Sequence, residues 1–398
     1  MITREITNEL LASAGEYPVA TVLGPRQSGK TTLVQMAFPD KVYYSLEDPD
    51  VRMAAETDPR GFLNNLPEGG ILDEIQRLPA LLSYIQGIVD GSKQKGMFIL
   101  TGSHQPDLQY AVSQTLAGRT AILNLLPFSL AELKKYRETW EAFEIMTKGT
   151  FPRIHEENLR PAGFFNGYLQ TYVERDVRAL INLKNLSQFQ RFIVLLAGRI
   201  GQIVNYSSLC NDIGVSATTV KNWISVLKAS FIVFELPPYF MNVRKRVVKS
   251  PKIYFSDVGL AAFVLGIETA DQLRRDPLRG GLYENFVILE IIKGFCNQGK
   301  RPDLFFYRDT HGNEVDLLIR RARVMIPVEI KSAATFTPDF LKGIDRFKAA
   351  TDDDVAQGFV LYNGSEQYTF KNTTIMNPIM HKGFERLWQG RGESTSIS

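Results

Sequence analysis

An eight-residue stretch near the start of the chain has the residue types that bind nucleotide phosphates. Residues 24–31 read Gly-Pro-Arg-Gln-Ser-Gly-Lys-Thr and match the pattern G-x-x-x-x-G-K-[ST] at every fixed position. Glycines let backbone N–H groups approach phosphate oxygens, Lys30 would reach the β- and γ-phosphates, and the Thr31 hydroxyl would bind Mg²⁺. We therefore expect ATP and Mg²⁺ to bind here. The expected contacts come from Gly24, Pro25, Arg26, Gln27, Ser28, Gly29, Lys30, Thr31 and Thr32.

A second group of polar residues follows the loop at the distance expected for the rest of a nucleotide site. Asp73 and Glu74 come after a short apolar run, where Asp73 would bind Mg²⁺ and Glu74 would orient or activate the attacking water. Ser103 ends a further apolar segment, where it would sense the γ-phosphate or cap the next helix. Arg119 would neutralise transition-state charge, in its own subunit or a neighbouring one, or it only stabilises a helix end.

The elements around these residues indicate a parallel α/β domain. Residues 19–23 are apolar and β-prone and residues 31–36 can continue as a helix, so the phosphate loop lies between a strand and a helix N-terminus. Residues 42–46 and 97–102 are further strand candidates, and residues 51–66 between them are predicted to be helical. Alternating strands and helices predict a parallel sheet that binds its ligand at the carboxyl ends of the strands.

Residues 205–224 have the pattern of a helix, a tight turn and a second helix. Gly214 occupies the turn and Ser216 can cap the second helix. That helix would expose polar residues of the kinds that reach base edges or phosphates, namely Thr218, Thr219, Lys221 and Asn222. Two β-like runs follow, as in a winged helix, and the second carries the basic residues Arg244, Lys245, Arg246 and Lys249. Double-stranded DNA is one expected partner, and packing against another part of the chain or a protein partner is the alternative.

A β-hairpin further along the chain would bring two carboxylates and a lysine together. A tight turn centred between Ala322 and Arg323 puts Asp316 directly opposite Glu329, and Lys331 shares their face because side chains alternate. Carboxylates this close repel each other unless a divalent cation or the lysine neutralises them. The group could bind Mg²⁺ and activate water against a phosphodiester, or it could be a salt-bridged cluster without catalysis.

Composition excludes few functions. The chain has 398 residues, of which 44% are hydrophobic and 22% charged, with a formal net charge of +3. This length predicts two to four domains, and the small charge excess argues neither for nor against nucleic acid. Two cysteines cannot form a disulfide framework, no apolar run approaches the roughly 20 residues that cross a bilayer, and the first residues do not resemble a signal peptide. We therefore expect a cytoplasmic protein without a membrane partner.

Taken together, these motifs resemble a large prokaryotic family of AAA-type ATPases that are fused to an uncharacterised C-terminal region. The resemblance implies ATP binding and hydrolysis. It rests on residues 24–31, 72–77, 100–103, 116–133, 168–176, 249–260, 314–316 and 328–332.

The hairpin resembles the PD-(D/E)xK nuclease superfamily, in which an Asp and a Glu-x-Lys lie on adjacent strands. By this resemblance Asp316 and Glu329 would be metal ligands, Glu284 would be the helical acid that some members add, and Lys331 would stabilise developing charge. The sequence departs from the pattern at Val315, where the nominal proline is absent.

The predicted fold class is therefore α/β, with four parts. We expect a P-loop parallel-sheet ATPase domain at residues 1–125, a helical lid at 126–186, a winged helix-turn-helix at 187–250 and a restriction-endonuclease-like α/β domain at 251–398. One hypothesis is a nucleotide-driven, DNA-associated protein with a nuclease domain. The other is a nucleotide-gated protein-interaction switch with an inactive nuclease-like domain. A role for Arg119 in a neighbouring subunit would also require a homo-oligomer.

Overall fold

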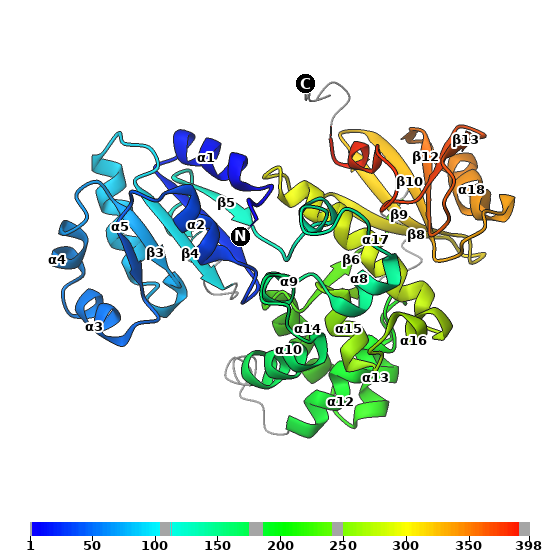
Figure 1. Ribbon diagram of the computed structural model, residues 1–398, viewed down its shortest axis with the longest axis horizontal. Coiled ribbons are helices and arrows are strands. Elements are labelled where there is room, and N and C mark those ends of the chain that lie inside the picture. Colours follow the sequence, from blue (N-terminus) through cyan, green and yellow to red (C-terminus); the bar gives the residue numbers. More distant parts are fainter. Residues whose placement is uncertain (1, 104–111, 113, 175–185, 241–249, 390–398) are drawn as a thin grey trace.

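The computed structural model describes residues 2–103, 112, 114–174, 186–240 and 250–389 (Figure 1). The predicted basic cluster, Arg244, Lys245, Arg246 and Lys249, lies outside the described residues, and so does the second β-like run that carries it. In the described part of the chain, no helix combines the length and the hydrophobicity needed to span a membrane.

The first part of the chain is a parallel sheet, as predicted, and it has five strands with helices on both faces. Its strands are β1 (Val19–Gly24), β2 (Tyr43–Ser45), β3 (Gly70–Asp73), β4 (Phe98–Ser103) and β5 (Thr120–Asn124), in the order β2-β3-β4-β1-β5. Every residue of β1, β3 and β4 is buried, which explains why these strands are continuous apolar runs rather than alternating ones.

Successive residues of each strand point to opposite faces of this sheet. On one face the strands pack with α4 (Pro59–Asn64) and α5 (Leu81–Gly91), and on the other with α1 (Thr7–Glu16) and α2 (Lys30–Ala37). The predicted helix at 51–66 is two helices, because Pro59 begins α4 directly after Asp58, which caps it and ends α3 (Pro49–Thr57).

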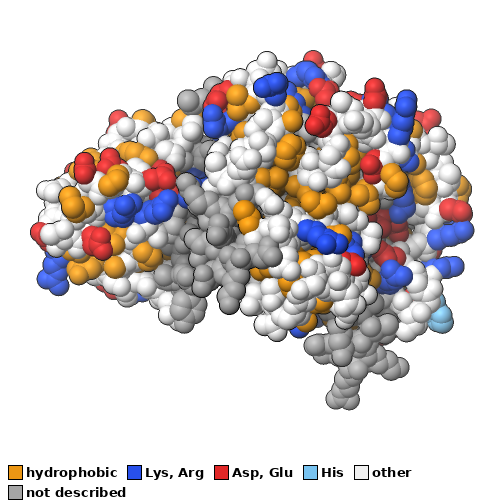
Figure 2. Space-filling view, turned by 90° about the horizontal axis from the view of Figure 1, so that it is seen from below, with side chains coloured by type: hydrophobic (Ala, Val, Ile, Leu, Met, Phe, Trp, Pro, Cys, Tyr) orange, Lys and Arg blue, Asp and Glu red, His pale blue; other side chains and the backbone are white. Residues whose placement is uncertain are grey.

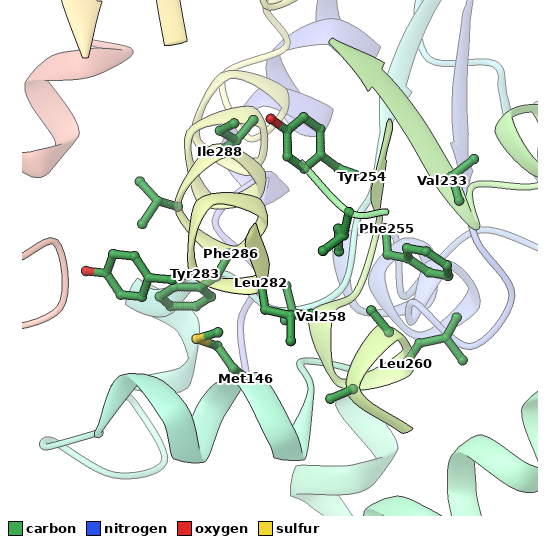
Figure 3. Packing of buried hydrophobic residues seen from close by; sticks show 14 of the residues in the cluster. Met146, Val233, Tyr254, Phe255, Val258, Leu260, Leu282, Tyr283, Phe286 and Ile288 are labelled. Atoms are coloured by element: carbon green, nitrogen blue, oxygen red, sulfur yellow. The ribbon is translucent and has the colours of Figure 1, made fainter. Parts of the chain in front are cut away.

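The helices after the parallel sheet were predicted to form a lid, which would pack against the nucleotide domain. They pack mainly against later parts of the chain instead. They are α7 (Leu130–Leu133), α8 (Ala142–Lys148), α9 (Pro152–Glu156), α10 (Pro161–Tyr168) and the π-helix η2 (Leu169–Glu174). The main contacts of α8 are with α15 (Val258–Val264) and α16 (Ala270–Arg275), and α10 also contacts α15. Figure 3 shows Met146 of α8 close to Leu282 and Phe286, which belong to the same core. These helices therefore share a core with much later residues instead of lying only on the nucleotide domain.

The helix-turn-helix is present as predicted. It consists of α13 (Tyr206–Ile213) and α14 (Ala217–Ala229), preceded by α12 (Leu186–Ala197). Gly214 ends α13 with φ 76°, a left-handed conformation that glycine adopts without strain, and the Ser216 side chain caps α14. Strand β6 (Val233–Leu236) then pairs antiparallel with β7 (Lys252–Phe255), whose Lys252 also bridges to Ile203.

The C-terminal part is a mixed seven-stranded sheet packed against a long helix, α17 (Arg279–Cys296). Most of its strands lie in the order β13-β14-β12-β10-β9-β8, and β11 pairs with β10. Their bounds are β8 (Leu304–Arg308), β9 (Glu314–Arg321), β10 (Val324–Lys331), β11 (Asp354–Val355), β12 (Gly358–Tyr362), β13 (Tyr368–Phe370) and β14 (Thr373–Met376). Helix α18 (Lys342–Ala350) and the short helices η3 (Pro338–Leu341) and η4 (Phe384–Leu387) complete this part.

Buried ion pairs connect the nucleotide domain to the rest of the protein. The Arg4 guanidinium binds the carbonyl oxygens of Ser28 and Leu126, both at 2.7 Å, and the Glu132 carboxylate at 2.9 Å. Glu290 and Lys293 of α17 pair with each other at 2.7 Å, and they bind the Leu130 N–H and the Phe128 carbonyl oxygen respectively. Residues 126–132 are therefore bound by Arg4 on one side and by α17 on the other. Three of their buried backbone groups, the Leu126 and Phe128 carbonyl oxygens and the Leu130 N–H, have charged partners.

Candidate functional site

The phosphate loop connects β1 to α2 in the predicted strand, loop and helix arrangement. Gly24 ends β1, and α2 begins at Lys30 after Gly29, whose φ is 89°. A Cβ atom on Gly24 would lie 2.2 Å from the Leu125 carbonyl oxygen, so only glycine allows β5 and the loop to approach this closely. The backbone N–H groups at the start of α2 are therefore available to an anion.

Lys30 is buried at the base of the loop. Its ammonium donates to the Pro25 carbonyl oxygen at 2.8 Å and to the Gly24 carbonyl oxygen at 3.2 Å. Burial lowers the pKa of Lys30, although Glu74 and Asp73 act in the opposite direction. The nearby Ser28 Oγ is buried and has no hydrogen-bond partner in the structure as described. A phosphate group would supply acceptors for both side chains, so this donor set fits a nucleotide.

Asp73 lies at the carboxyl end of β3, where three hydroxyl groups surround it. The Thr31 hydroxyl and the Tyr43 hydroxyl both donate to Asp73 Oδ2 at 2.8 Å, and the Thr101 hydroxyl donates to Oδ1. Hydroxyl and carboxylate oxygens are the ligands that Mg²⁺ prefers, and Thr31 and Asp73 already face each other. This donor set therefore fits the predicted Mg²⁺ site.

Glu74 follows Asp73 in a left-handed conformation, with φ 58° and ψ 46°. Its backbone N–H binds the Thr101 hydroxyl at 3.3 Å. One carboxylate oxygen, Oε2, accepts from the Gln76 amide and from the Ser103 hydroxyl, the latter at 3.4 Å. Among the described residues no donor reaches the other oxygen, Oε1. A strained backbone at a non-glycine residue is typical of a functional position.

Arg119 is the predicted site residue that the structure does not bring to this edge. It precedes β5, and its carbonyl oxygen accepts from Val19 N–H at the start of β1, whereas the phosphate loop follows the end of β1. The length of β1 separates them by about 17 Å at the usual rise per residue. Arg119 is instead paired with Asp90, with Nη2 2.9 Å from Oδ2. Arg119 therefore lies too far from the phosphate loop to act on a nucleotide in its own subunit, and a role in a neighbouring subunit is the alternative that remains to be tested.

Several residues around the nucleotide site were missed by the sequence analysis. Tyr43 and Gln76 contact the two acidic residues, and Arg4 holds the Ser28 carbonyl oxygen. Arg153 and Arg160, from α9 and the start of α10, line a recess of about 380 Å³ together with Gln27 of the phosphate loop. Their positions depend on packing between distant segments, and no local motif indicates them.

The second group of predicted residues also comes together. Arg321 pairs with Val324 and Leu317 with Val328, which is the register predicted for the hairpin. The Lys331 ammonium binds Asp316 Oδ2 at 2.7 Å and Glu329 Oε2 at 2.6 Å, and the Ile330 N–H donates to Asp316 Oδ2 at 2.8 Å. Asp316, Glu329 and Lys331 thus form one cluster on the face that alternation predicts.

Glu284 of α17 joins this region through a lysine that the sequence analysis missed. Lys252 of β7 is 3% exposed, and its ammonium lies 2.9 Å from Glu284 Oε1 and 2.5 Å from Glu314 Oε1. The Tyr254 hydroxyl also donates to Glu284 Oε1, at 2.5 Å. Four carboxylates and two ammonium groups therefore gather between α17, β7, β9 and β10. The Arg308 guanidinium also lies 3.3 Å from Glu314 Oε2, so four carboxylates face three cationic groups.

Burial and the two lysines push the pKa values of the carboxyls apart. Burial raises the pKa of Glu284 to about 7 against the opposing effect of Lys252. Burial and the neighbouring Asp316 raise the pKa of Glu329 well above its ordinary range. Asp316 is also buried, but Lys331 and Lys252 outweigh this effect and hold its pKa below the usual range. Asp316 is therefore the carboxylate that the cluster keeps ionised.

In the C-terminal cluster, lysine side chains lie where the predicted metal ion would bind. Within the described ranges, no group of three or more His, Cys, Asp or Glu side chains is placed to hold a metal ion. Lys252 and Lys331 occupy positions between the carboxylates and neutralise them. A divalent cation would therefore have to displace an ammonium contact before it could bind these carboxylates.

Three of the four predicted polar residues of α14 are exposed, namely Thr218, Lys221 and Asn222, whereas Thr219 is half-buried and its hydroxyl bonds that of Ser216 at 2.8 Å. The opposite face of α14 is buried against α12 and α13 through Val220, Trp223, Ile224 and Leu227. In the face of the molecule seen in Figure 2, charged side chains of both signs are interspersed with hydrophobic ones. The exposed polar residues of α14 form the local patch to consider for a nucleic-acid contact.

Three family models match successive parts of the chain. An AAA domain matches residues 16–134, and two domains of unknown function, DUF8612 and DUF4143, match residues 139–271 and 279–381. The first of these matches covers the parallel sheet and the phosphate loop, so this part of the chain is similar to an AAA domain.

The chain also resembles proteins of other organisms. An uncharacterized protein of Mycobacterium tuberculosis is 28% identical over 382 residues, covering 94% of this chain and 83% of the relative. An uncharacterized protein of Haemophilus influenzae is 21% identical over 248 residues, covering 58% of each chain. A Walker-type ATPase of Pyrococcus abyssi matches 66% of this chain and 97% of its own, at 17% identity and a TM-score of 0.40. A TM-score this low does not establish a common overall fold.

We predict that Arg119→Ala leaves ATP turnover within about threefold of wild type, because an exposed ion pair at the far edge of the sheet contributes little. Steady-state turnover of the purified chain measures this, and Arg77→Ala, which removes another exposed arginine pairing with Glu47, is the matched control. A 100-fold loss with Arg119→Ala alone, restored by mixing with a Lys30→Ala chain, would instead assign Arg119 to a neighbouring subunit.

Proposed function

We propose that this protein binds ATP with Mg²⁺ and hydrolyses it at the edge formed by β1, β3 and β4. The observation that carries the proposal is the hydrogen bond of 2.8 Å between Thr31, the last residue of the phosphate-loop motif, and Asp73, at the end of β3. Two residues 42 positions apart thereby present the hydroxyl and carboxylate oxygens of a magnesium site beside a buried lysine.

Each residue of this edge has a role in the proposed reaction. Thr31 and Asp73 would hold Mg²⁺, which supplies charge neutralisation at the phosphate oxygens. Lys30 would exchange its contacts with the Gly24 and Pro25 carbonyl oxygens for the β- and γ-phosphates. Gln76 and Ser103 hold Oε2 of Glu74, which leaves Oε1 to accept a proton from the attacking water.

We expect Glu74→Gln to bind ATP with unchanged affinity and to hydrolyse it at least 100-fold more slowly, because an amide cannot accept the proton of water. Fluorescent-nucleotide titration and phosphate release measure the two properties separately. Glu47→Gln, at a nearby exposed carboxylate, should change neither. Unchanged turnover of Glu74→Gln would exclude Glu74 as the residue that activates water.

A second proposed function is metal-dependent cleavage of DNA at the C-terminal cluster. Its support is the convergence of Asp316, Glu329 and Lys331 in the predicted register, together with Glu284 from α17. Asp316 and Glu329 would bind the metal ion, and Lys331 would stabilise the charge that develops on a phosphate. The competing function is a nucleotide-gated contact with a protein, which would leave the cluster as a neutralised, structural group.

We predict that the wild-type chain cleaves double-stranded DNA with Mg²⁺ or Mn²⁺ and that Asp316→Ala and Lys331→Ala lose at least 100-fold of this activity. Asp345→Asn, at an exposed carboxylate of α18, is the control and should cleave normally. A nicking assay with supercoiled plasmid, with and without ATP, measures the effect. Cleavage that survives in Asp316→Ala, or is absent from wild type with either metal, would favour the protein-contact function.

The exposed face of α14 is the proposed contact with DNA. Lys221 and Asn222 are the side chains that can reach a phosphate or a base edge. We expect Lys221→Ala to weaken duplex binding several-fold and to lower the slope of log K against log salt by about one, as one lost phosphate contact predicts. Lys342→Ala, at an exposed lysine of α18, should leave both unchanged. Binding that is insensitive to salt would contradict the proposal.

A further inference from the structure

Arg4 is a buried arginine outside the phosphate-loop motif that contacts the loop directly. Its side chain is 7% exposed, and Nη1 donates to the Ser28 carbonyl oxygen at 2.7 Å. A Cβ atom added to Gly29 would lie 3.6 Å from the same nitrogen, so the guanidinium also packs against the next residue of the loop. Arg4 therefore contacts the peptide unit that joins Ser28 to Gly29, immediately before Lys30.

Three further contacts fix the Arg4 guanidinium in place. Nη2 donates to the Leu126 carbonyl oxygen at 2.7 Å, Nε lies 2.9 Å from Glu132 Oε1, and the guanidinium carbon lies 4.9 Å from the centre of the Phe128 ring. Glu132 is fully buried, and its Oε2 accepts from the Ser129 N–H at 2.9 Å in the capping box of α7. The planar guanidinium is therefore oriented by groups that do not belong to the phosphate loop.

The contact with Arg4 sets the direction of the Gly29 N–H. A trans peptide unit is planar, and its C=O and N–H groups point in opposite directions. Because the Ser28 carbonyl oxygen points to Arg4, the Gly29 N–H of the same unit points away from Arg4. Gly29 directly precedes α2, whose first N–H groups have no acceptor within the helix. The Gly29 N–H thus joins the N–H groups that an anion at the start of α2 can use.

The phosphate loop needs such a contact because its backbone conformation is unusual. Gln27 has φ 62° and Gly29 has φ 89°, so the residues on both sides of Ser28 are in the left-handed region. Gln27 has a Cβ atom, and it adopts that conformation only at a cost in free energy. Alternation of left-handed and other conformations gathers successive N–H groups around one point, which is a geometry that binds phosphate. Arg4 holds the residue between the two left-handed ones.

We propose that Arg4 is a positioning residue for phosphate binding, which acts through the Ser28–Gly29 peptide unit without touching the nucleotide. It fixes the Ser28 carbonyl oxygen and thereby keeps the Gly29 N–H directed at a phosphate group. This proposal rests on the proposed binding of ATP at this loop. Loss of the contact should weaken nucleotide binding with little change in kcat, because the N–H binds the phosphate in the ground state and in the transition state alike.

The sequence allows this one peptide unit to be observed directly. Ser28–Gly29 is the only place in the sequence where glycine follows serine. When serine carbonyl carbons carry ¹³C and glycine nitrogens carry ¹⁵N, a carbonyl-filtered NMR experiment on the full chain therefore detects the Gly29 amide alone. We expect a non-hydrolysable ATP analogue with Mg²⁺ to shift this amide proton downfield in wild type, because it gains a hydrogen bond to phosphate.

Two variants change the contact to different degrees. Arg4→Met keeps the stem of the side chain and removes every donor. It should raise the Kd of the analogue and the KM for ATP about tenfold or more, leave kcat within about threefold of wild type, and reduce the Gly29 shift by more than half. Arg4→Lys keeps the charge beside Glu132 and one donor group, so it should recover part of the affinity and of the shift.

A matched control removes a guanidinium elsewhere in the chain. Arg199 also binds a backbone carbonyl oxygen and a carboxylate, those of Leu195 and Asp212, where α12 meets α13. Arg199→Met should leave the affinity and the Gly29 shift unchanged. Thermal unfolding of all the variants reports whether the chains are folded.

Three results would overturn the proposal. One is a folded Arg4→Met chain with the affinity and the Gly29 shift of wild type, and if that chain does not fold, the same result for Arg4→Lys counts. Another is a loss confined to kcat, as expected when fewer molecules are active. The third is a loss of affinity with the full Gly29 shift retained at saturation. That result would assign Arg4 to the nucleoside end of the ligand, in the recess of about 170 Å³ that it lines with Ile2, Thr32 and Phe128.

The same measurements separate this proposal from the proposed ATP site. A wild-type chain that binds no nucleotide and shows no Gly29 shift would overturn both. A wild-type chain that binds ATP, with variants of Arg4 that bind it equally well, would overturn only the role of Arg4.

Discussion

The nucleotide site depends on one constraint, the parallel alignment of β1, β3 and β4. Because Gly24 pairs with Ser103 and the neighbouring strands run in the same direction, the residues that follow each strand emerge at the same edge of the sheet. Asp73 is thereby surrounded by hydroxyls from α2, β2 and β4. The same alignment places Arg119, which precedes a strand, at the opposite edge. A polar residue can act on a nucleotide here only if it lies at the carboxyl end of a strand rather than before its first residue.

The two candidate sites manage buried charge in different ways. At the nucleotide site, hydroxyl groups surround Asp73 and backbone carbonyl oxygens accept from Lys30. Both charged side chains thus have uncharged partners, which a ligand can replace. At the C-terminal cluster, Lys252 and Lys331 pair directly with the carboxylates. A ligand there competes with ion pairs that burial has already strengthened. The first arrangement is prepared for a ligand, whereas the second is stable without one.

The parts of the chain are held together by contacts that cross long sequence separations. Arg4 connects the phosphate loop to residues 126–132, and Glu290 with Lys293 connects those residues to α17. The same helix carries Glu284 of the second cluster. The core that contains α8 and α15 also extends into the C-terminal sheet. The nucleotide domain keeps hydrophobic cores of its own, and buried polar contacts through residues 126–132 connect it to the core shared by α8, α15 and α17.

Sequence alone determined the features that depend on local periodicity and turn geometry. The phosphate loop, the turn at Gly214 and the register around Ala322 were predictable, because a few adjacent residues set each of them. Tertiary structure alone decided the partners of the predicted helices, the distance of Arg119 from the loop and the entry of Lys252 into the cluster. These depend on which distant segments pack together, and hydrophobic packing is not directional enough for one segment to specify its partner.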